Sequence, residues 1–308
     1  MNRTVNHAHV TGMTWDAKDK IGICHDCPAG KAKQRPVQKE STGRHKEKKG
    51  QRIHADASGR LPIPTFGGAR YEHLIVENSC RMLFGRGIKR APEATSVIDQ
   101  WIDEETVGVN SDLVIQEFMS DNDPKSYGAP EHKSMLTRRR IKDCSTPDYR
   151  AAYNGIAEQN LGVVNEMATA AMHYAGIEDL RYIVMAFMHA VWIKNHLHRE
   201  LTGSIPWWDW YRTPVDFTYV RIFGCPAFVT IPPRHQRAKR PKHWLGVYVG
   251  VASNGVGFKI CHPRKLKTYD CHDVTFDENW REDTRLTITG GDKDYDPAIE
   301  DRNDVGNN

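Results

Sequence analysis

The sequence predicts a mixed α/β fold in which a sheet with flanking helices precedes a small β-rich region. Runs typical of strands come first, at RIHADASG (52–59) and YEHLIVENSC (71–80). Helical periodicity then dominates from 155 to 197. Beyond Gly203–Pro206 the chain changes to short aromatic segments punctuated by glycine and proline. Strands followed by helices favour an α/β or α+β domain whose sheet begins antiparallel.

The remaining elements follow in chain order. A third strand is expected to end at 86–89, and TSVIDQWIDEE (95–105) has the spacing of a helix with one buried face. The segment 114–123 is typical of a strand that runs into a polar turn. Two helices are expected, from 155 to about 174 and from 180 to 197. Three aromatic segments predict a small barrel or meander: VRIFGCPAFVTIP, HWLGVYVGVASNGVGFKI and KTYDCHDVTFDE.

Length and composition restrict the class of protein. A chain of 308 residues is long enough for two domains. It has no apolar run long enough to cross a bilayer, and MNRTVNHAHV lacks a signal-peptide core, so we expect a soluble protein with no membrane partner. Its seven scattered cysteines do not form the pattern of a disulfide framework, which favours a reducing compartment.

Charge is distributed unevenly along the chain. The formal net charge is only +4, but basic residues gather at 31–52 and 234–242, while 282–308 is acidic. Two basic stretches indicate contact with a polyanion, although solvated linkers would have the same composition. The candidate contacts to a nucleic-acid backbone are Arg234, Arg237, Lys239, Arg240 and Lys242, followed by Lys46, Lys48 and Lys49.

Three acidic residues occupy positions that can converge. Asp56 lies in the centre of the first predicted strand, Asp121 ends a later strand, and Glu158 opens the helix after it. Three carboxylates at one sheet edge would repel one another unless cations held them, and Mg²⁺ is the usual partner of such groups. By itself Glu158 is an ordinary surface charge in a first helical turn. A chain with 39 acidic residues offers many triples, so position alone does not select this one.

The flanking residues resemble a known family. The segments around the three carboxylates, and the 36 residues between Asp121 and Glu158, resemble the D,D(35)E integrase core of copia-type LTR retrotransposons: IHADASG, SDN and TPDYRAAYNGIAEQN. CHDCPAGKAKQRP (24–36) is similar to the end of that family's zinc-binding region. VRIFGCPAFVTIP, LGVYVG and HDVTFDE resemble the block after its core. The resemblance runs from about Cys24 to Glu278.

The resemblance implies an RNase H-like mixed sheet with flanking helices, followed by a small β-rich, SH3-like domain. Asp56, Asp121 and Glu158 would hold Mg²⁺ or Mn²⁺, and Cys24 and Cys27 would remain from a Zn²⁺ site. The implied reactions are 3′-end processing and strand transfer on double-stranded DNA, at element ends and target DNA, by a homo-oligomer in the nucleus or, failing that, the cytoplasm. The expected regions are 1–35 (zinc-binding remnant), 36–51 (basic linker), 52–204 (catalytic core), 205–282 (β-rich domain) and 283–308 (acidic disordered tail).

The chain departs from the family where chemistry and DNA contact are expected. The family usually has Asn-Gly-Gly-Glu-Tyr after the second aspartate, whereas Asp123 and Pro124 here restrict the turn. The basic residues usual beside the glutamate are replaced at 159–162 by Gln, Asn, Leu and Gly. A structural zinc also needs four ligands, and the two cysteines supply half. We therefore expect a truncated, divergent copy. Its function would be that of an active integrase or of an inactive remnant that binds nucleic acid. A nuclease that cuts RNA in a hybrid would use the same metal site, but the flanking motifs do not support it.

Overall fold

The structure is a computed structural model that describes residues 10–11, 48–145, 154–265 and 267–280. Cys24, Cys27, Lys46 and the acidic tail lie outside these residues. The chain divides into two compact units, each described here by itself. The first comprises the residues up to 173 together with 179–218, and the second comprises 174–178 and the residues from 219 onward.

A five-stranded mixed sheet forms the centre of the first unit, in the order β4-β3-β2-β5-β6. Strands β2, β3 and β4 pair antiparallel, whereas β5 and β6 join β2 in parallel. The strands span Arg52–Ala57 (β2), Tyr71–Glu77 (β3), Leu83–Ile88 (β4), Glu117–Met119 (β5) and Lys142–Asp143 (β6). Strand β3 is buried along almost its whole length, which fits a position inside a sheet covered on both faces.

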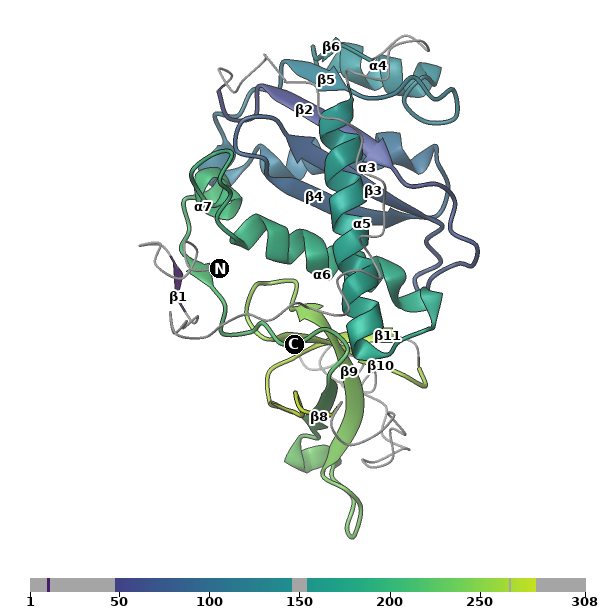
Figure 1. The fold of residues 1–308 in the computed structure, drawn as a ribbon, viewed down its shortest axis with the longest axis vertical. Coiled ribbons are helices and arrows are strands. Elements are labelled where there is room, and N and C mark those ends of the chain that lie inside the picture. The colour runs from purple at the N-terminus through teal and green to yellow at the C-terminus, as the bar shows by residue number, and fades with distance from the viewer. Residues whose placement is uncertain (1–9, 12–47, 146–153, 266, 281–308) are drawn as a thin grey trace, which may run out of the picture. The chain divides into compact units, whose positions relative to one another are not determined.

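Helices cover this sheet, and Figure 1 shows the longest of them, α5, running across it. Alternate residues of the central strands, such as Ile53 and Ile75, pack in one cluster with Ile98 of helix α3 and Leu136 of helix α4. The helices of this unit span Glu93–Glu105 (α3), Pro130–Arg138 (α4), Gly155–Ala175 (α5), Ile183–His196 (α6) and Pro206–Tyr211 (α7), with 3₁₀ turns at Gly108–Asn110 (η1) and Leu180–Tyr182 (η3). A short parallel pair joins Val10–Thr11 (β1) to Val215–Asp216 (β7).

The second unit is an antiparallel sheet in the order β11-β10-β9-β8-β12. Its strands span Pro226–Thr230 (β8), His243–Val251 (β9), Phe258–His262 (β10), Lys267–Cys271 (β11) and Val274–Phe276 (β12), with a 3₁₀ turn at Pro233–His235 (η4). Tyr248, Phe258 and Phe276 pack their rings together in its core. The predicted fold class, a mixed sheet with helices followed by a small β-rich unit, is confirmed.

Several details differ from expectation. Helices α4 and α7 were not predicted, and each has proline at its start. His189 and His196 lie on helix α6 and are both buried, because this helix is apolar on all sides. Residues 205–218 lie in the first unit, and the domain boundaries proposed from sequence stay predictions. No helix among the described residues is both long and apolar enough to span a bilayer.

Candidate active site

The register of the sheet brings two of the three predicted carboxylates together. Strands β2 and β5 run parallel, with Arg52 opposite Glu117 and His54 opposite Met119. Asp56 and Asp121 each lie two residues beyond the last of these pairs, so they stand at the same end of adjoining strands. Asp56 is the penultimate residue of β2 rather than its centre, which leaves its side chain only half-buried at the sheet edge.

The third carboxylate is positioned through Asn154, immediately before helix α5. Its side-chain amide donates to the carbonyl of Ala55 (3.1 Å), next to Asp56 in strand β2. Asn154 is 2% exposed, and its own carbonyl accepts from the backbone N–H of Glu158 (3.2 Å). This residue therefore ties the first turn of α5 to β2. Sequence alone indicated an ordinary chain reversal at Asn-Gly, not a helix anchor.

The charges of Asp121 and Glu158 both act on the pKa of Asp56. Burial raises the pKa of Asp56 to about 7; a hydrogen bond from the N–H of Ala57 opposes this rise, and the charges of Asp121 and Glu158 add to it. Partial desolvation likewise raises the pKa of Asp121, although the residue as a whole is exposed. Asp56 thus experiences repulsion from both of its predicted partners.

This arrangement fits a divalent cation without being preassembled around one. Within the described ranges, no three His, Cys, Asp or Glu side chains already lie together as a metal-binding group. The raised pKa of Asp56 nevertheless shows that negative charge there is opposed by its surroundings. A hard cation would relieve that repulsion and is suited to carboxylate oxygens, so Asp56, Asp121 and Glu158 are a suitable set of ligands.

The turn after Asp121 is held by internal hydrogen bonds. Asp123 accepts from the hydroxyl of Ser126 (2.9 Å) and from the backbone N–H of Lys125 (3.3 Å), and its carbonyl accepts from the N–H of Gly128 (2.8 Å). A Cβ at Gly128 would lie 2.7 Å from the carbonyl oxygen of Asn122, so this turn requires glycine there. The segment that carries Asp121 is therefore a closed turn, consistent with the restriction expected from Asp123 and Pro124.

Two further residues near the carboxylates were not predicted. Tyr127 is 1% exposed, and its hydroxyl has no hydrogen-bond partner in the described part of the chain. Burial and the charges of Asp56 and Asp121 hold its pKa well above the usual range. Burial also raises the pKa of Glu72, on strand β3, to about 7. A glutamate inside a strand is a sequence signal of the same kind as Asp56, whereas nothing in the sequence distinguished Tyr127.

Comparison with known proteins shows similarity to retroviral and retrotransposon polyproteins. A family model described as the retroviral polymerase SH3-like domain matches residues 225–288. The retrovirus-related Pol polyprotein from transposon TNT 1-94 of Nicotiana tabacum is 21% identical over 227 residues, or 74% of this chain. These matches support a retrotransposon integrase-type protein. The Pol polyprotein from transposon RE1 of Arabidopsis thaliana is 24% identical over 53% of this integrase-type chain, which spans 17% and 11% of the lengths of the two polyproteins.

Solved structures similar to the integrase-type chain include viral integrase cores. The catalytic core domain of BIV integrase is 15% identical, with a TM-score of 0.39, and the match covers 53% of this chain and 95% of that one. The HTLV-2 integrase core in complex with magnesium is also 15% identical, with a TM-score of 0.39, over 52% of this chain and 96% of that one. The sequence comparisons support the predicted retrotransposon integrase type, and the family model confirms the SH3-like domain.

The predicted DNA-contact residues of the integrase-type chain divide into two groups. The loop between β8 and β9 presents exposed basic side chains, namely Arg234, Arg237, Lys239, Arg240 and Lys242. In the linker, Lys48 is exposed, but Lys49 donates to Asn110 (2.7 Å) and to the carbonyl of Trp210 (3.0 Å). Lys49 is therefore occupied in hydrogen bonds within the first unit. The β8–β9 loop has more exposed basic side chains than the described part of the linker.

Proposed function

We propose that this chain is a copia-type integrase that cuts and joins DNA by metal-dependent phosphoryl transfer. Its reactions would be 3′-end processing of element ends and strand transfer into target DNA. The observation that carries the proposal is the convergence of Asp56 and Asp121 at one end of adjoining strands, with the charge of Glu158 acting on Asp56. Such convergence is unfavourable for the folded chain, and a bound cation would offset the repulsion.

Each carboxylate has a distinct part in the proposal. Asp56 and Asp121, on the rigid sheet, would hold Mg²⁺ or Mn²⁺ from one side, and Glu158, on the first turn of α5, from another. A pair of such ions supplies activation of the attacking oxygen and stabilisation of the leaving oxygen of a phosphodiester. Asp56, whose pKa is about 7 without metal, would have to be ionised to hold such an ion. No covalent enzyme intermediate is required.

Double-stranded DNA would be held partly by the β8–β9 loop. Its five basic side chains are exposed on the SH3-like unit, where they can approach phosphates without disturbing a core. Cations that neutralise phosphates release counterions, so this loop would give the complex a salt-dependent affinity. In this proposal the working form is a homo-oligomer on DNA in the nucleus, where target DNA resides.

The second candidate is a nucleic-acid-binding remnant without turnover. One observation favours it: Asp123 closes the turn beside Asp121 with hydrogen bonds from Lys125 and Ser126. A segment fixed in this way has less freedom to bring Asp121 into a shared metal site. The two candidates agree on DNA binding and differ only in chemistry.

The deciding experiment is divalent-metal-dependent nicking and strand transfer on a labelled duplex that carries element-end sequence. Wild type is compared with Glu158→Gln and with Glu131→Gln, which removes a glutamate from the first turn of helix α4 instead of α5. We expect product from wild type and Glu131→Gln, and none from Glu158→Gln. Equal background from all three proteins would refute turnover and leave the remnant.

A further inference from the structure

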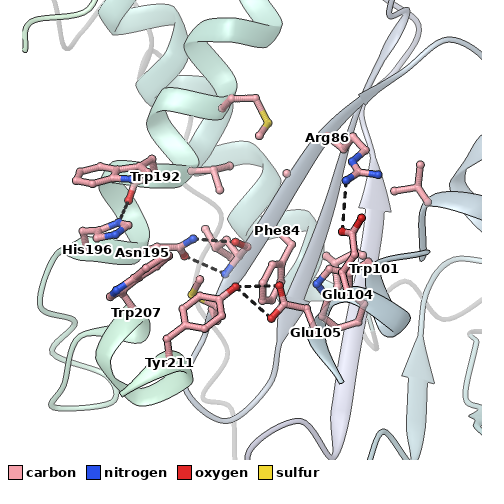
Figure 2. A pocket seen from close by; sticks show the side chains of 17 residues that line it. Phe84, Arg86, Trp101, Glu104, Glu105, Trp192, Asn195, His196, Trp207 and Tyr211 are labelled. Atoms are coloured by element: carbon pink, nitrogen blue, oxygen red, sulfur yellow. Dashed lines mark hydrogen bonds and ion pairs between the residues drawn. The ribbon is translucent and has the colours of Figure 1, made fainter. Parts of the chain in front are cut away.

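A cavity of about 260 Å³ lies in the first unit between strand β4 and helices α3, α6 and α7, and Figure 2 shows the side chains around it. None of the three predicted catalytic carboxylates lines this cavity. It has room for several waters, each of which takes about 30 Å³ in the liquid, but is at the small end for ligand sites. Its size suits one side chain or a small organic molecule.

Aromatic rings form two opposing walls. On the helical side, Trp192 stacks on His196 (3.7 Å between ring centroids), His196 on Trp207 (4.5 Å), and Tyr211 follows (4.4 Å). On the side of β4 and α3, Phe84 packs against Trp101 (4.9 Å). Burial lowers the pKa of His196 to about 4, so this ring is neutral near pH 7. The walls are therefore uncharged and rich in π-electron density.

The charged groups at the cavity are mainly acidic. Glu105 accepts hydrogen bonds from Nε1 of Trp210 (2.7 Å) and from the hydroxyl of Tyr211 (2.8 Å), which are both neutral donors. In the described part of the chain it forms no salt bridge. Glu104 lies 3.6 Å from the guanidinium of Arg86. Two carboxylates and one guanidinium therefore line the cavity, and burial raises the pKa of Glu105.

The charge of Lys49 lowers the pKa of Glu105, but within the described residues the two side chains form no salt bridge. The ammonium of Lys49 is bonded to Asn110 and to the backbone of Trp210, and it affects the pKa of Glu105 less than burial does. A half-buried carboxylate without a paired cation is unfavourable, since such groups are normally compensated by one. Figure 2 shows Glu105 and Tyr211 joined at one end of the space between the two aromatic walls.

The ligand chemistry follows from these features. Aromatic faces attract cations through their quadrupole, and carboxylates at the same place add to that attraction. Phosphates and nucleic acids would instead be repelled. We infer that this cavity binds an alkylammonium group on an apolar stem, as carried by a lysine side chain of a partner protein, with or without N-methylation. The site would give the integrase-type chain a protein contact separate from its DNA contacts.

The first test uses choline and its uncharged isostere 3,3-dimethylbutan-1-ol, titrated into the full chain by isothermal calorimetry. The two probes have the same shape, so only charge distinguishes them. We expect choline to bind roughly tenfold more tightly, which corresponds to about 1.4 kcal/mol. Equal affinities, or no choline binding, would overturn the proposal. Lysine and trimethyllysine peptides, titrated in the same way, separate the two protein sources of the ammonium group.

Variants locate the binding. Glu104→Gln removes one exposed charge, and Trp207→Leu removes one aromatic face. Each should weaken choline binding by threefold or more, whereas Glu131→Gln on helix α4 should leave it unchanged. If Trp207→Leu fails to fold, Glu104→Gln still decides the matter. A choline affinity that Glu131→Gln weakens as much as Glu104→Gln, or sedimentation showing that a second copy closes the cavity, would refute the assignment.

Discussion

Replacing Asp56 with asparagine should stabilise the metal-free protein, although it removes a proposed catalytic group. Asp56 lies where burial and two neighbouring carboxylates oppose its negative charge. Asparagine has nearly the same shape and can still accept from the N–H of Ala57, which donates to the Asp56 carboxylate (2.8 Å) in the wild type. The substitution therefore removes the repulsion and leaves the packing in place.

The magnitude follows from the pKa. In the unfolded chain Asp56 ionises at its ordinary value of 3.8, and in the folded protein at about 7. Between these values the folded state holds a proton that the unfolded state lacks, so the free energy of unfolding falls by about 1.4 kcal/mol for each pH unit of rise. The protonated Asp56 can contribute at most about 4 kcal/mol to the free energy of unfolding. This contribution is present in full below the pKa of the unfolded state and is lost as pH rises through the pKa of the folded state. Because Asp56 is only partly buried, we expect about 1–3 kcal/mol.

Urea denaturation in the presence of a chelator measures this effect. At about pH 8, Asp56→Asn should unfold at higher urea than wild type, and the difference should shrink toward about pH 4. Adding Mg²⁺ should stabilise wild type by about 2.7 kcal/mol at a hundredfold excess over the dissociation constant, and should have little effect on the variant. Glu72→Gln is the control for the effect of Mg²⁺. It replaces another carboxyl group whose pKa is raised to about 7, and it leaves the three proposed ligands unchanged. An Asp56→Asn protein no more stable than wild type at about pH 8 would refute the electrostatic argument.

Three further results are expected. Asn154→Ala should lower the free energy of unfolding by about 1–3 kcal/mol in urea denaturation and reduce nicking, because helix α5 loses its bond to Ala55, whereas Asn160→Ala should do neither. Gly128→Ala should destabilise by about 1–3 kcal/mol in thermal unfolding, because its Cβ meets a backbone oxygen, whereas Gly59→Ala has open space. Neutralising Arg237, Lys239 and Arg240 of the β8–β9 loop should lower the salt slope of DNA binding by about 3 in fluorescence anisotropy titrations. An unchanged slope would exclude this loop as a DNA contact.

Much of the fold could be predicted because its strands carry strong apolar signals. Strand β3 contains the apolar run 74–76 and is buried along most of its length, and helix α3 spaces Ile98 and Trp101 on one face. Strand β6 consists of two exposed polar residues, Lys142 and Asp143, so no hydrophobic pattern marks it. Its pairing depends on the neighbouring strand β5. Helices α4 and α7 are short, and proline at the first position was their main local signal.

The sequence predicted the three carboxylates of the candidate site, but not the residues that position and surround them. Asp56 was detectable because a charged side chain in a strand needs compensation, and its companions followed from the resemblance. The role of Asn154 depends on a hydrogen bond across 99 residues of sequence, which no local pattern records. No local pattern distinguishes Tyr127 either, because the rings around it come from separate elements, including His73 of strand β3 and His132 of helix α4. The cavity beside β4 also combines residues from strands and helices that lie far apart in the sequence, so no single segment marks it.

Metal binding and turnover would require different things of this site. An experiment that measures them separately therefore distinguishes the two candidate functions. Binding needs only that a cation relieve the repulsion at Asp56, which the sheet imposes whether or not the neighbouring turn moves. Turnover also needs Asp121 and Glu158 to close around the cation, and the turn closed by Asp123 resists that movement. Mg²⁺ could stabilise the protein through Asp56 while no Glu158-dependent nicking is detected. That result would mean that the turn after Asp121 limits turnover in an integrase fold. Asp123→Gly would then be expected to restore product.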